Sequence, residues 1–105
     1  MHEETCIKYR LVSSLLSKRR RDKKLSQTAQ FLVLKRSGVA IRTKGQLSYW
    51  ESGERLPPPS QLSLIAETYG VDLQELKLAY VADKTVHAVK TAMVDVGLPI
   101  ANMTP

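Results

Sequence analysis

The 105-residue sequence is poor in the residues that build metal sites and catalytic centres. A lone cysteine, Cys6, has no partner for an internal disulfide. The two histidines, His2 and His87, stand far apart without the paired spacing of metal ligands. The few glycines are scattered and form neither a phosphate-binding loop nor a nucleophile elbow. We therefore expect no metal, no cofactor and no enzymatic activity.

Long apolar runs are also missing, so no segment has the length needed to span a bilayer. The first residues carry two acids, Glu3 and Glu4, and lack the basic start and apolar stretch of a secretion signal. We expect a cytoplasmic protein with no membrane partner. Its length and its hydrophobic fraction of 43% suit one modest globular core.

The charge is strongly asymmetric along the chain. Residues 1–55 hold 13 of the 16 Lys and Arg and five acids, whereas residues 56–105 hold three bases and five acids. The net charge of +6 therefore comes from the first half, which is the candidate surface for a polyanion. A run such as Lys18-Arg19-Arg20-Arg21 can equally be a solvated helix face.

Hydrophobic residues recur at three- and four-residue steps, which predicts an all-α protein. Residues 5–24 form a first helix in this interpretation, with Arg20 continuing its buried stripe; the stripe consists of Ile7, Leu11, Leu15 and Leu16. Ser26 is a good N-cap for a second helix over 27–37 that ends before Gly38. The core face of this second helix consists of Phe31, Leu32 and Leu34.

A third helix is predicted from Thr43 to Gly53. Thr43 followed by Gln46 is the pattern of a capping box, and Gly53 suits the C-terminal end. On a helical wheel Leu47 and Trp50 share one arc, and the opposite arc is polar. One face of this helix is therefore expected in the core and the other in solvent.

The second half of the chain predicts two more helices and a helical tail. Three consecutive prolines, 57–59, make a stiff connector, after which Ser60 caps a fourth helix that ends at Gly70. Asp72 with Glu75 caps a short fifth helix that carries Leu73, Leu76 and Tyr80. Composition shifts after residue 82, so we expect a domain over 5–82 and a tail over 83–105, with a stripe of Val86, Val89, Met93 and Val96.

The order of these parts resembles the Cro and phage-repressor helix-turn-helix proteins, the XRE family, over roughly residues 11–80. Arg20 stands at the usual step before Leu25-Ser26-Gln27, which opens the second helix of that family. Residues 47–53, LSYWESG, resemble the end of its recognition helix, and residues 64–71, LIAETYGV, its last helices. The resemblance implies a five-helix, lambda-repressor-like domain that binds double-stranded DNA.

One departure concerns the segment between Gln27 and Trp50, which is longer than in most members. We place the extra residues at 35–42, at the end of the second helix and in the turn. Because these residues lie between the two helices of the motif, they can change the orientation in which the domain approaches DNA.

The resemblance implies that the third helix enters the major groove and that its first turns touch base edges. Lys44 suits guanine, Tyr49 suits a thymine methyl or a phosphate, and Ser48 suits a base edge or the backbone. Gln46 is open to two readings, an adenine contact or the capping box. Gly45 permits close approach of the helix backbone to DNA, or is simply a tolerated glycine.

Phosphate contacts are expected from residues around the motif, which add affinity and register without reading sequence. Gln27 stands at the start of the second helix, where family members use a glutamine for a phosphate and where free N–H groups favour an anion. The other candidates are Lys35, Arg36, Arg42 and Thr43.

Arg20 and Glu51 are predicted to form a structural ion pair. Both fall on buried arcs of their helices, and the resemblance implies that they join the first helix to the third. Truncating either would leave a buried charge unpaired, at a cost on the order of 3–5 kcal/mol.

The leading hypothesis is a small transcriptional repressor that binds paired half-sites as a homodimer. Leu73, Leu76, Tyr80 and the Val86–Val96 stripe are the candidate dimer residues, although the stripe can also fold back on its own domain. One alternative is an antitoxin that represses its own operon and binds a toxin through its tail. Others are a protein-interaction adaptor and, with less support, an RNA-binding protein.

Overall fold

The computed structural model describes residues 7–99, which form five α-helices and one short 3-10 helix. Within these residues the predicted all-α class is confirmed. His2, Glu3, Glu4, Cys6 and the outer ends of the expected segments 5–82 and 83–105 lie outside the described residues. The elements are α1 (Arg10–Asp22), α2 (Gln27–Arg36), α3 (Lys44–Ser52), η2 (Pro59–Gln61), α4 (Leu62–Tyr69) and α5 (Leu73–Asp95).

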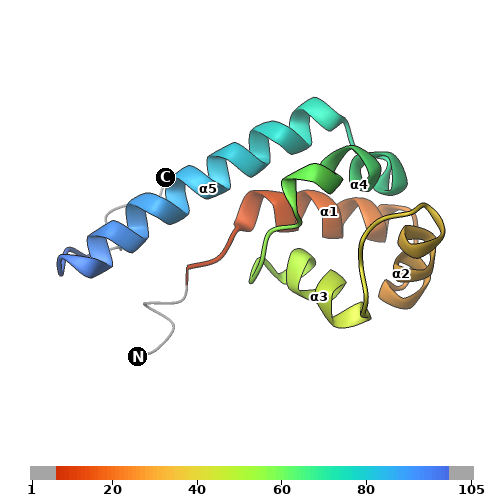
Figure 1. Ribbon diagram of the computed structural model, residues 1–105, viewed down its shortest axis with the longest axis horizontal. Helices are drawn as coiled ribbons and strands as arrows, with labels where there is room; N and C mark the ends of the chain where they lie inside the picture. Colours follow the sequence, from red (N-terminus) through yellow and green to blue (C-terminus); the bar gives the residue numbers. More distant parts are fainter. Residues whose placement is uncertain (1–6, 100–105) are drawn as a thin grey trace.

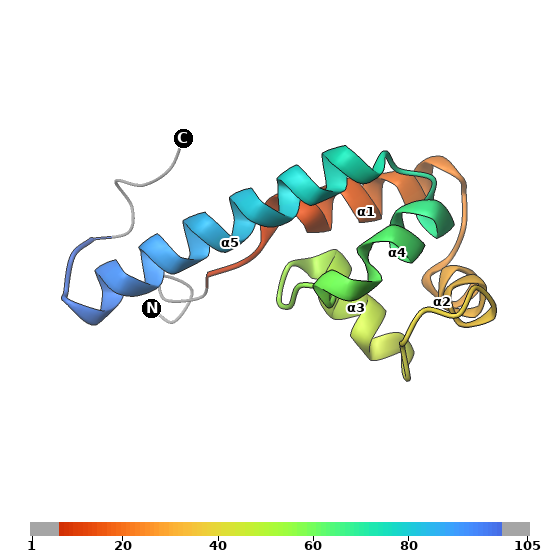
Figure 2. The same ribbon diagram turned by 45° about the horizontal axis from the view of Figure 1, so that its top comes forward.

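The helices are arranged around α1, which contacts α3, α4 and α5 (Figure 1). Figure 2 shows α5 running beside α1 while α2 and α3 lie on the other side of the molecule. The core contains residues from every α-helix: Val12, Leu16, Leu34, Val39, Ile41, Leu47, Trp50, Leu62, Ile65, Ala66, Tyr69 and Leu76. This core fixes α3 with one side toward α1.

The first helix begins later than expected, at Arg10 rather than near residue 5. Its N-cap residue, Tyr9, provides no side-chain hydrogen bond. Instead the buried carboxylate of Asp83 on α5 accepts hydrogen bonds from the N–H groups of Leu11 and Val12, at 3.1 and 2.8 Å. A side chain more than seventy positions away in the sequence therefore caps α1.

The predicted buried stripe of the first helix is wrong at Leu11, whose exposed fraction is 52%. Val12 and Leu16 are fully buried instead, because they lie on the side of α1 that contacts the core. Leu15 is half-buried and lies with Leu11 along a groove between α1 and α5.

The second helix and its turn follow the prediction in outline. The Ser26 hydroxyl accepts a hydrogen bond from the Ala29 N–H at 3.1 Å, as an N-cap should. Leu32, however, is 47% exposed, and Gln30 is buried in its place. The long turn over 37–43 is held from inside, because Val39 and Ile41 are buried in the core.

The expected Ser60 cap is wrong. Pro59 opens the 3-10 helix η2, and α4 starts only at Leu62, with Gln61 as an N-cap that makes no side-chain hydrogen bond. The fixed φ of proline suits the first position of such a turn and moves the start of the α-helix along the chain.

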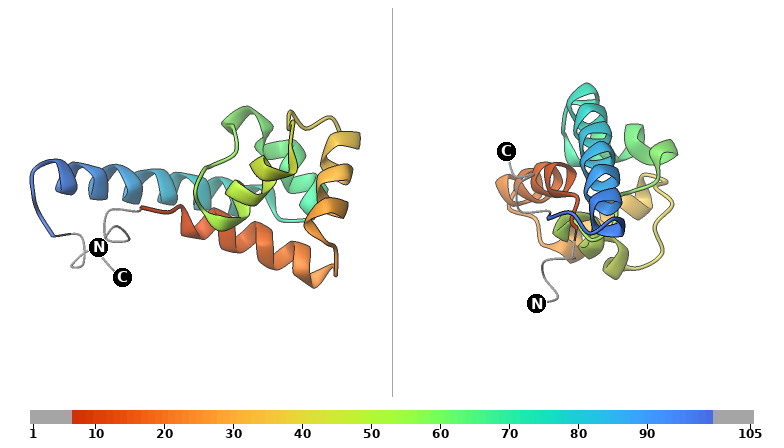
Figure 3. Two further views of the ribbon diagram at one scale, coloured as in Figure 1. Left: turned by 90° about the horizontal axis from the view of Figure 1, so that it is seen from below. Right: turned by 90° about the vertical axis from the view of Figure 1, so that its left-hand side faces the viewer.

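The short fifth helix and the separate tail helix are also wrong, because α5 is continuous from Leu73 to Asp95. Residues 73–95 contain neither glycine nor proline, so nothing interrupts the helix at residue 82. The expected domain boundary falls inside this helix. Figure 3 shows its C-terminal half projecting beyond the other helices.

The continuous helix changes which residues are available to a partner. Leu76 is fully buried, and Leu73 and Tyr80 are half-buried against the core. These three dimer candidates are therefore corrected to core residues of the same chain. Val86, Val89 and Val96 stay exposed on the projecting half.

Two further findings concern residues 7–99 alone. None of their helices combines the length and apolarity that a membrane crossing requires. No cluster of three or more potential metal ligands occurs among them.

We predict that Asp83→Ala lowers the free energy of unfolding by about 1–3 kcal/mol, because two N–H groups of α1 lose their acceptor. Asp83→Asn keeps one carbonyl oxygen and should lose less. Urea unfolding followed by circular dichroism measures both. Glu67→Ala removes an exposed carboxylate on α4 and serves as the control; equal losses for Asp83→Ala and Glu67→Ala would contradict the role of the cap.

Candidate nucleic-acid interface

The ends of α3 are fixed by local hydrogen bonds, as the sequence predicts. The Thr43 hydroxyl accepts from the Gln46 N–H at 3.3 Å, and the Gln46 Oε1 accepts from the N–H groups of Arg42 and Thr43. Gly53 ends the helix with a φ of 86°, a left-handed conformation that favours glycine. The capping box uses the carbonyl of the Gln46 side chain and leaves its NH₂ group as a donor.

The helix is divided into an inner and an outer face. Leu47, Trp50 and Glu51 are buried. The residues that we predict to read bases lie outside: Lys44, Gly45, Gln46 and Tyr49 are exposed, and Ser48 is half-buried. The polar arc of the predicted wheel is therefore the accessible one.

Glu51 is the buried carboxylate that holds α3 in this orientation. The Arg20 Nε donates to both of its oxygens, at 2.8 and 3.0 Å, which is the ion pair that the sequence predicts. The sequence analysis did not predict two further donors, the Tyr69 hydroxyl at 2.8 Å and the Gln27 amide at 3.3 Å. Glu51 thus joins α3 to α1, α2 and α4.

The buried environment beside Glu51 shifts the pKa of the Tyr69 hydroxyl. Burial raises the pKa of the Tyr69 hydroxyl above its ordinary value of 10.0, and the neighbouring Glu51 charge and the hydrogen bond to it raise the pKa further. The nearby Arg20 charge acts in the opposite direction but is the smaller effect. Tyr69 therefore stays protonated and keeps donating to Glu51.

The N-terminal ends of α2 and α3 lie side by side. Lys44 Nζ is 3.4 Å from the Thr28 hydroxyl. Residues 23–50, which include all of α2 and most of α3, contain no acidic residue and six Lys and Arg. The segment that contains α2, the turn and most of α3 is therefore basic and free of acids, and the exposed Glu54 follows directly after α3.

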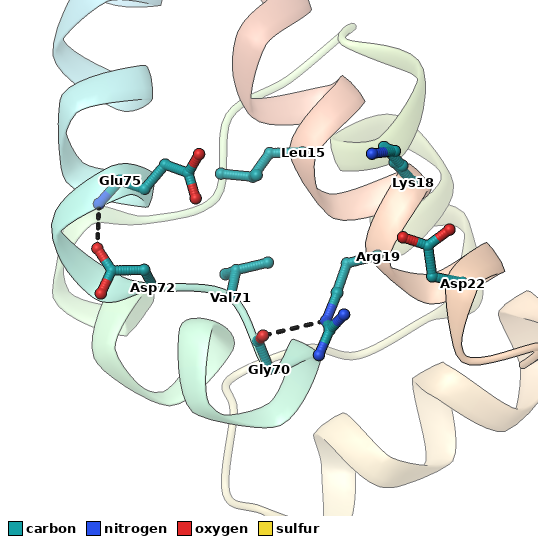
Figure 4. A pocket seen from close by; sticks show the side chains of 8 residues that line it. All are labelled: Leu15, Lys18, Arg19, Asp22, Gly70, Val71, Asp72 and Glu75. Carbon is teal, nitrogen blue, oxygen red and sulfur yellow. Dashed lines mark hydrogen bonds between the residues drawn. The ribbon is translucent and has the colours of Figure 1, made fainter.

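The basic run of α1 is divided among several roles. Arg20 serves Glu51 and also donates to the Leu25 carbonyl at 2.7 Å. Arg19 and Lys23 donate to the carbonyls of Gly70 and Thr68 at the end of α4, and Figure 4 shows the contact of Arg19. These cations stabilise the C-terminal end of a neighbouring helix. Arg21 and Lys24 are exposed.

Arg55 is a residue that sequence reasoning missed. Its guanidinium lies 5.2 Å from the centre of the Tyr49 ring, in a cation–π arrangement. The N–H groups of Gly53, Glu54 and Arg55 all donate to the Tyr49 carbonyl and hold this contact in place. The only sequence signal was an arginine shortly after the helix-ending glycine.

The residues that we predict to bind phosphate lie in three separate parts of the structure. Arg42 and Thr43 are exposed beside the start of α3. Lys35 and Arg36 lie at the other end of α2 from Thr28, with the Lys35 ammonium 5.7 Å from the centre of the Phe31 ring. Gln27 lies at the start of α2, where its amide already donates to Glu51.

Comparison with protein families gives one match that agrees with this geometry. Residues 42–76 match a helix-turn-helix family model. The matched segment is a third of the chain and runs from the end of the long turn through α3, η2 and α4 into α5. Neither the comparison with curated proteins nor the comparison with solved structures gave a match.

The fold and the matched segment define a DNA-binding helix-turn-helix protein. Over these residues the match supports the predicted resemblance to the Cro and phage-repressor type, and the all-helical architecture of residues 7–99 fits the lambda-repressor-like fold. The match begins at Arg42, the last residue of the segment 35–42 in which we place the extra residues.

We predict that Tyr69→Phe lowers the free energy of unfolding at neutral pH by about 1.5–3 kcal/mol, because Glu51 loses a buried donor. Since the folded-state pKa of Tyr69 is raised, its contribution is complete below pH 10 and declines as pH rises above 10, where only the unfolded chain releases the proton. The gap between wild type and variant should therefore narrow above pH 10.

Denaturant titrations at pH 8 to 11 measure this gap. Tyr80→Phe is the control, since the Tyr80 hydroxyl makes no hydrogen bond to any described residue. A gap that stays constant across this range would contradict the raised pKa as the source of the stabilisation.

Proposed function

We propose that this protein is a transcriptional repressor that binds specific double-stranded DNA sequences by inserting α3 into the major groove. The observation that carries the proposal is the split of α3: Trp50, Leu47 and Glu51 lie inside, and the polar face lies outside, in a basic segment, residues 23–50, that contains no acidic residue. The major groove accepts a helix of this size, and cations around it attract the phosphate backbone.

Base reading is assigned to the outer residues Lys44, Gly45, Gln46, Ser48 and Tyr49. Lys44 donates to guanine O6 and N7 in this proposal. Because capping occupies the Gln46 carbonyl, its NH₂ group is the part that contacts a base, as a donor only. This supports contact with an acceptor on a base rather than the two-bond recognition of adenine.

Phosphate binding is assigned to residues on either side of α3. Arg42 and Thr43 precede it, and the start of α2 with Gln27 offers helix N–H groups to an anion. Lys35 and Arg36 extend the contact toward the other end of α2. The protein acts in the cytoplasm without a catalytic role, and binding of two half-sites requires a homodimer.

Gly45 supports close contact between α3 and DNA. Its φ is not in the left-handed region, and an added Cβ would meet only the Thr43 hydroxyl, at an ordinary 3.5 Å. Nothing in the fold requires glycine here, although glycine weakens a helix by roughly 0.5–1 kcal/mol relative to alanine. Close approach of a DNA strand to this position would explain why a glycine stands there.

We therefore expect Gly45→Ala to raise the free energy of unfolding by about 0.5–1 kcal/mol while weakening operator binding at least tenfold. Urea unfolding measures the first effect and fluorescence anisotropy with selected DNA measures the second. The gain in stability is an internal control for folding. Unchanged DNA affinity in the stabilised variant would remove Gly45 from the interface.

Selection of bound sites from a random DNA pool tests the assignment as a whole. We expect Lys44→Ala to change the preferred base at one position in each half-site. Lys35→Ala and Arg36→Ala should weaken all sequences about equally and reduce the slope of log affinity against log salt by about one each. Lys84→Ala, an exposed charge on α5, is the matched control.

Four outcomes would overturn parts of the proposal. An unchanged motif would exclude Lys44 from base reading, and a base-specific loss at Lys35 or Arg36 would contradict a phosphate role. Absence of any salt-sensitive DNA binding would favour the protein-interaction adaptor. A protein that co-purifies through the α5 end would favour the antitoxin.

A further inference from the structure

Tyr49 has the largest side chain on the outer face of α3, and it is 42% exposed. An exposed tyrosine can turn about two side-chain torsions, so its ring keeps one direction only where a neighbour restricts it. The guanidinium of Arg55, 5.2 Å from the centre of the ring, is such a neighbour. The cation is attracted to the face of the ring and limits the directions that the ring can take.

The backbone brings Arg55 back to Tyr49. The chain leaves α3 through Gly53, whose left-handed φ of 86° turns it sharply, and the N–H groups of residues 53–55 all donate to the Tyr49 carbonyl. The next two residues, Leu56-Pro57, are half-buried and fully buried. Arg55 is therefore anchored on both sides, which holds its side chain near the ring.

Arginine suits this position better than lysine. Its guanidinium is planar and weakly hydrated, so it can stack on a ring while its N–H groups point away in the plane. Within residues 7–99 no hydrogen bond or ion pair engages the Arg55 guanidinium, which leaves the Tyr49 ring as its contact. The pair is thus not part of the core, and its effect is confined to the outer face of α3.

Open surface lies beside the ring. Gly45 stands one helical turn before Tyr49 on the same face, and an added Cβ there would meet only the Thr43 hydroxyl within 4 Å. Side chains of a helix lean toward its N-terminal end, so the Tyr49 ring leans toward this open surface. An aromatic ring beside a bare helix backbone suits an apolar contact with the C5-methyl group of thymine, which projects into the major groove.

We propose that Arg55 is a positioning residue for base recognition, which holds the Tyr49 ring where it contacts the methyl group of a thymine. This inference rests on the proposed binding of α3 in the major groove, and it adds the chemistry that Tyr49 recognises. Of the two roles considered for Tyr49, a thymine methyl or a phosphate, it selects the first. Arg55 acts through the ring and does not itself read a base.

Uracil tests the contact, because it lacks only the C5-methyl of thymine and keeps the same base pairing. The thymine to be replaced is the one whose selection from a random DNA pool Tyr49→Ala relaxes. Fluorescence anisotropy then compares DNA with thymine and DNA with uracil at that position. Uracil should weaken wild-type binding about fourfold, the effect of losing one buried methyl-sized group. Tyr49→Ala should bind the two DNAs equally.

Variants of Arg55 separate positioning from charge. Arg55→Ala should reduce the preference for thymine to less than about twofold, although Tyr49 is still present. Arg55→Lys keeps the charge and should therefore keep the salt dependence of binding, but it lacks the planar group and should lose most of the thymine preference. Circular dichroism checks that the variants fold.

Arg42→Ala is the matched control, since it removes an exposed cation at the opposite end of α3. Its overall affinity should fall while its preference for thymine over uracil stays at the wild-type value. A preference that falls equally in Arg42→Ala and Arg55→Ala would contradict a specific role of Arg55.

Three results would overturn the inference. The first is a wild-type thymine preference in Arg55→Ala, which would show that Arg55 acts only as a cation near the phosphate backbone. The second is equal wild-type affinity for the two DNAs, and the third is a selected motif in which Tyr49→Ala relaxes no thymine. In each case a base change caused by Lys44→Ala would leave the proposed function in place, whereas absence of specific DNA binding would overturn both.

Discussion

The carboxylate of Glu51 is the interaction on which the geometry of this protein depends. It receives Arg20 from α1, Gln27 from α2 and Tyr69 from α4, while its own backbone belongs to α3. A buried ion pair often adds little net stability, but losing one partner leaves an uncompensated charge. Its main effect here is therefore geometric, since only one rotation of α3 satisfies all three donors.

That rotation decides what α3 presents to solvent. With Glu51, Leu47 and Trp50 inside, Gly45 and Tyr49 must lie outside, because the helical period places them on the other side. The same carboxylate draws Gln27 inward and so brings the start of α2 close to α3. The side-by-side N-terminal ends, marked by Lys44 and Thr28, are a consequence of this arrangement.

Sequence reasoning was most effective where local rules act. The ends of α3 followed from Thr43, Gln46 and Gly53, because capping depends on residues a few positions apart. The contact of Arg20 with Glu51 followed from two helical stripes. The Asp83 cap had no comparable signal, since its partners Leu11 and Val12 lie more than seventy positions away in the sequence.

The errors at Leu11, Leu32 and the fifth helix have one common cause. Periodicity shows that a helix has an apolar side, but it does not tell which neighbour covers that side. Leu11 and Leu32 belong to apolar arcs that the core covers only in part, and Gln30 is buried beside Leu34 on α2. Similarly, the valines after residue 82 suggested a second helix with its own packing, although they continue α5 away from the core.

The two ends of α5 give this helix a double role that follows from its length. Near its middle, Asp83 fixes the start of α1, and His87 stacks on Tyr9, whose N–H donates to the carbonyl of Gly53 at the end of α3. Helix α5 is therefore joined through one residue, Tyr9, to the C-terminal end of α3, the helix that we propose reads DNA. Since these contacts connect α5 directly to the end of α3, a dimer formed through α5 would set the separation of its two α3 helices by the direction of α5. The spacing of half-sites would then be set by helix geometry rather than by a flexible linker.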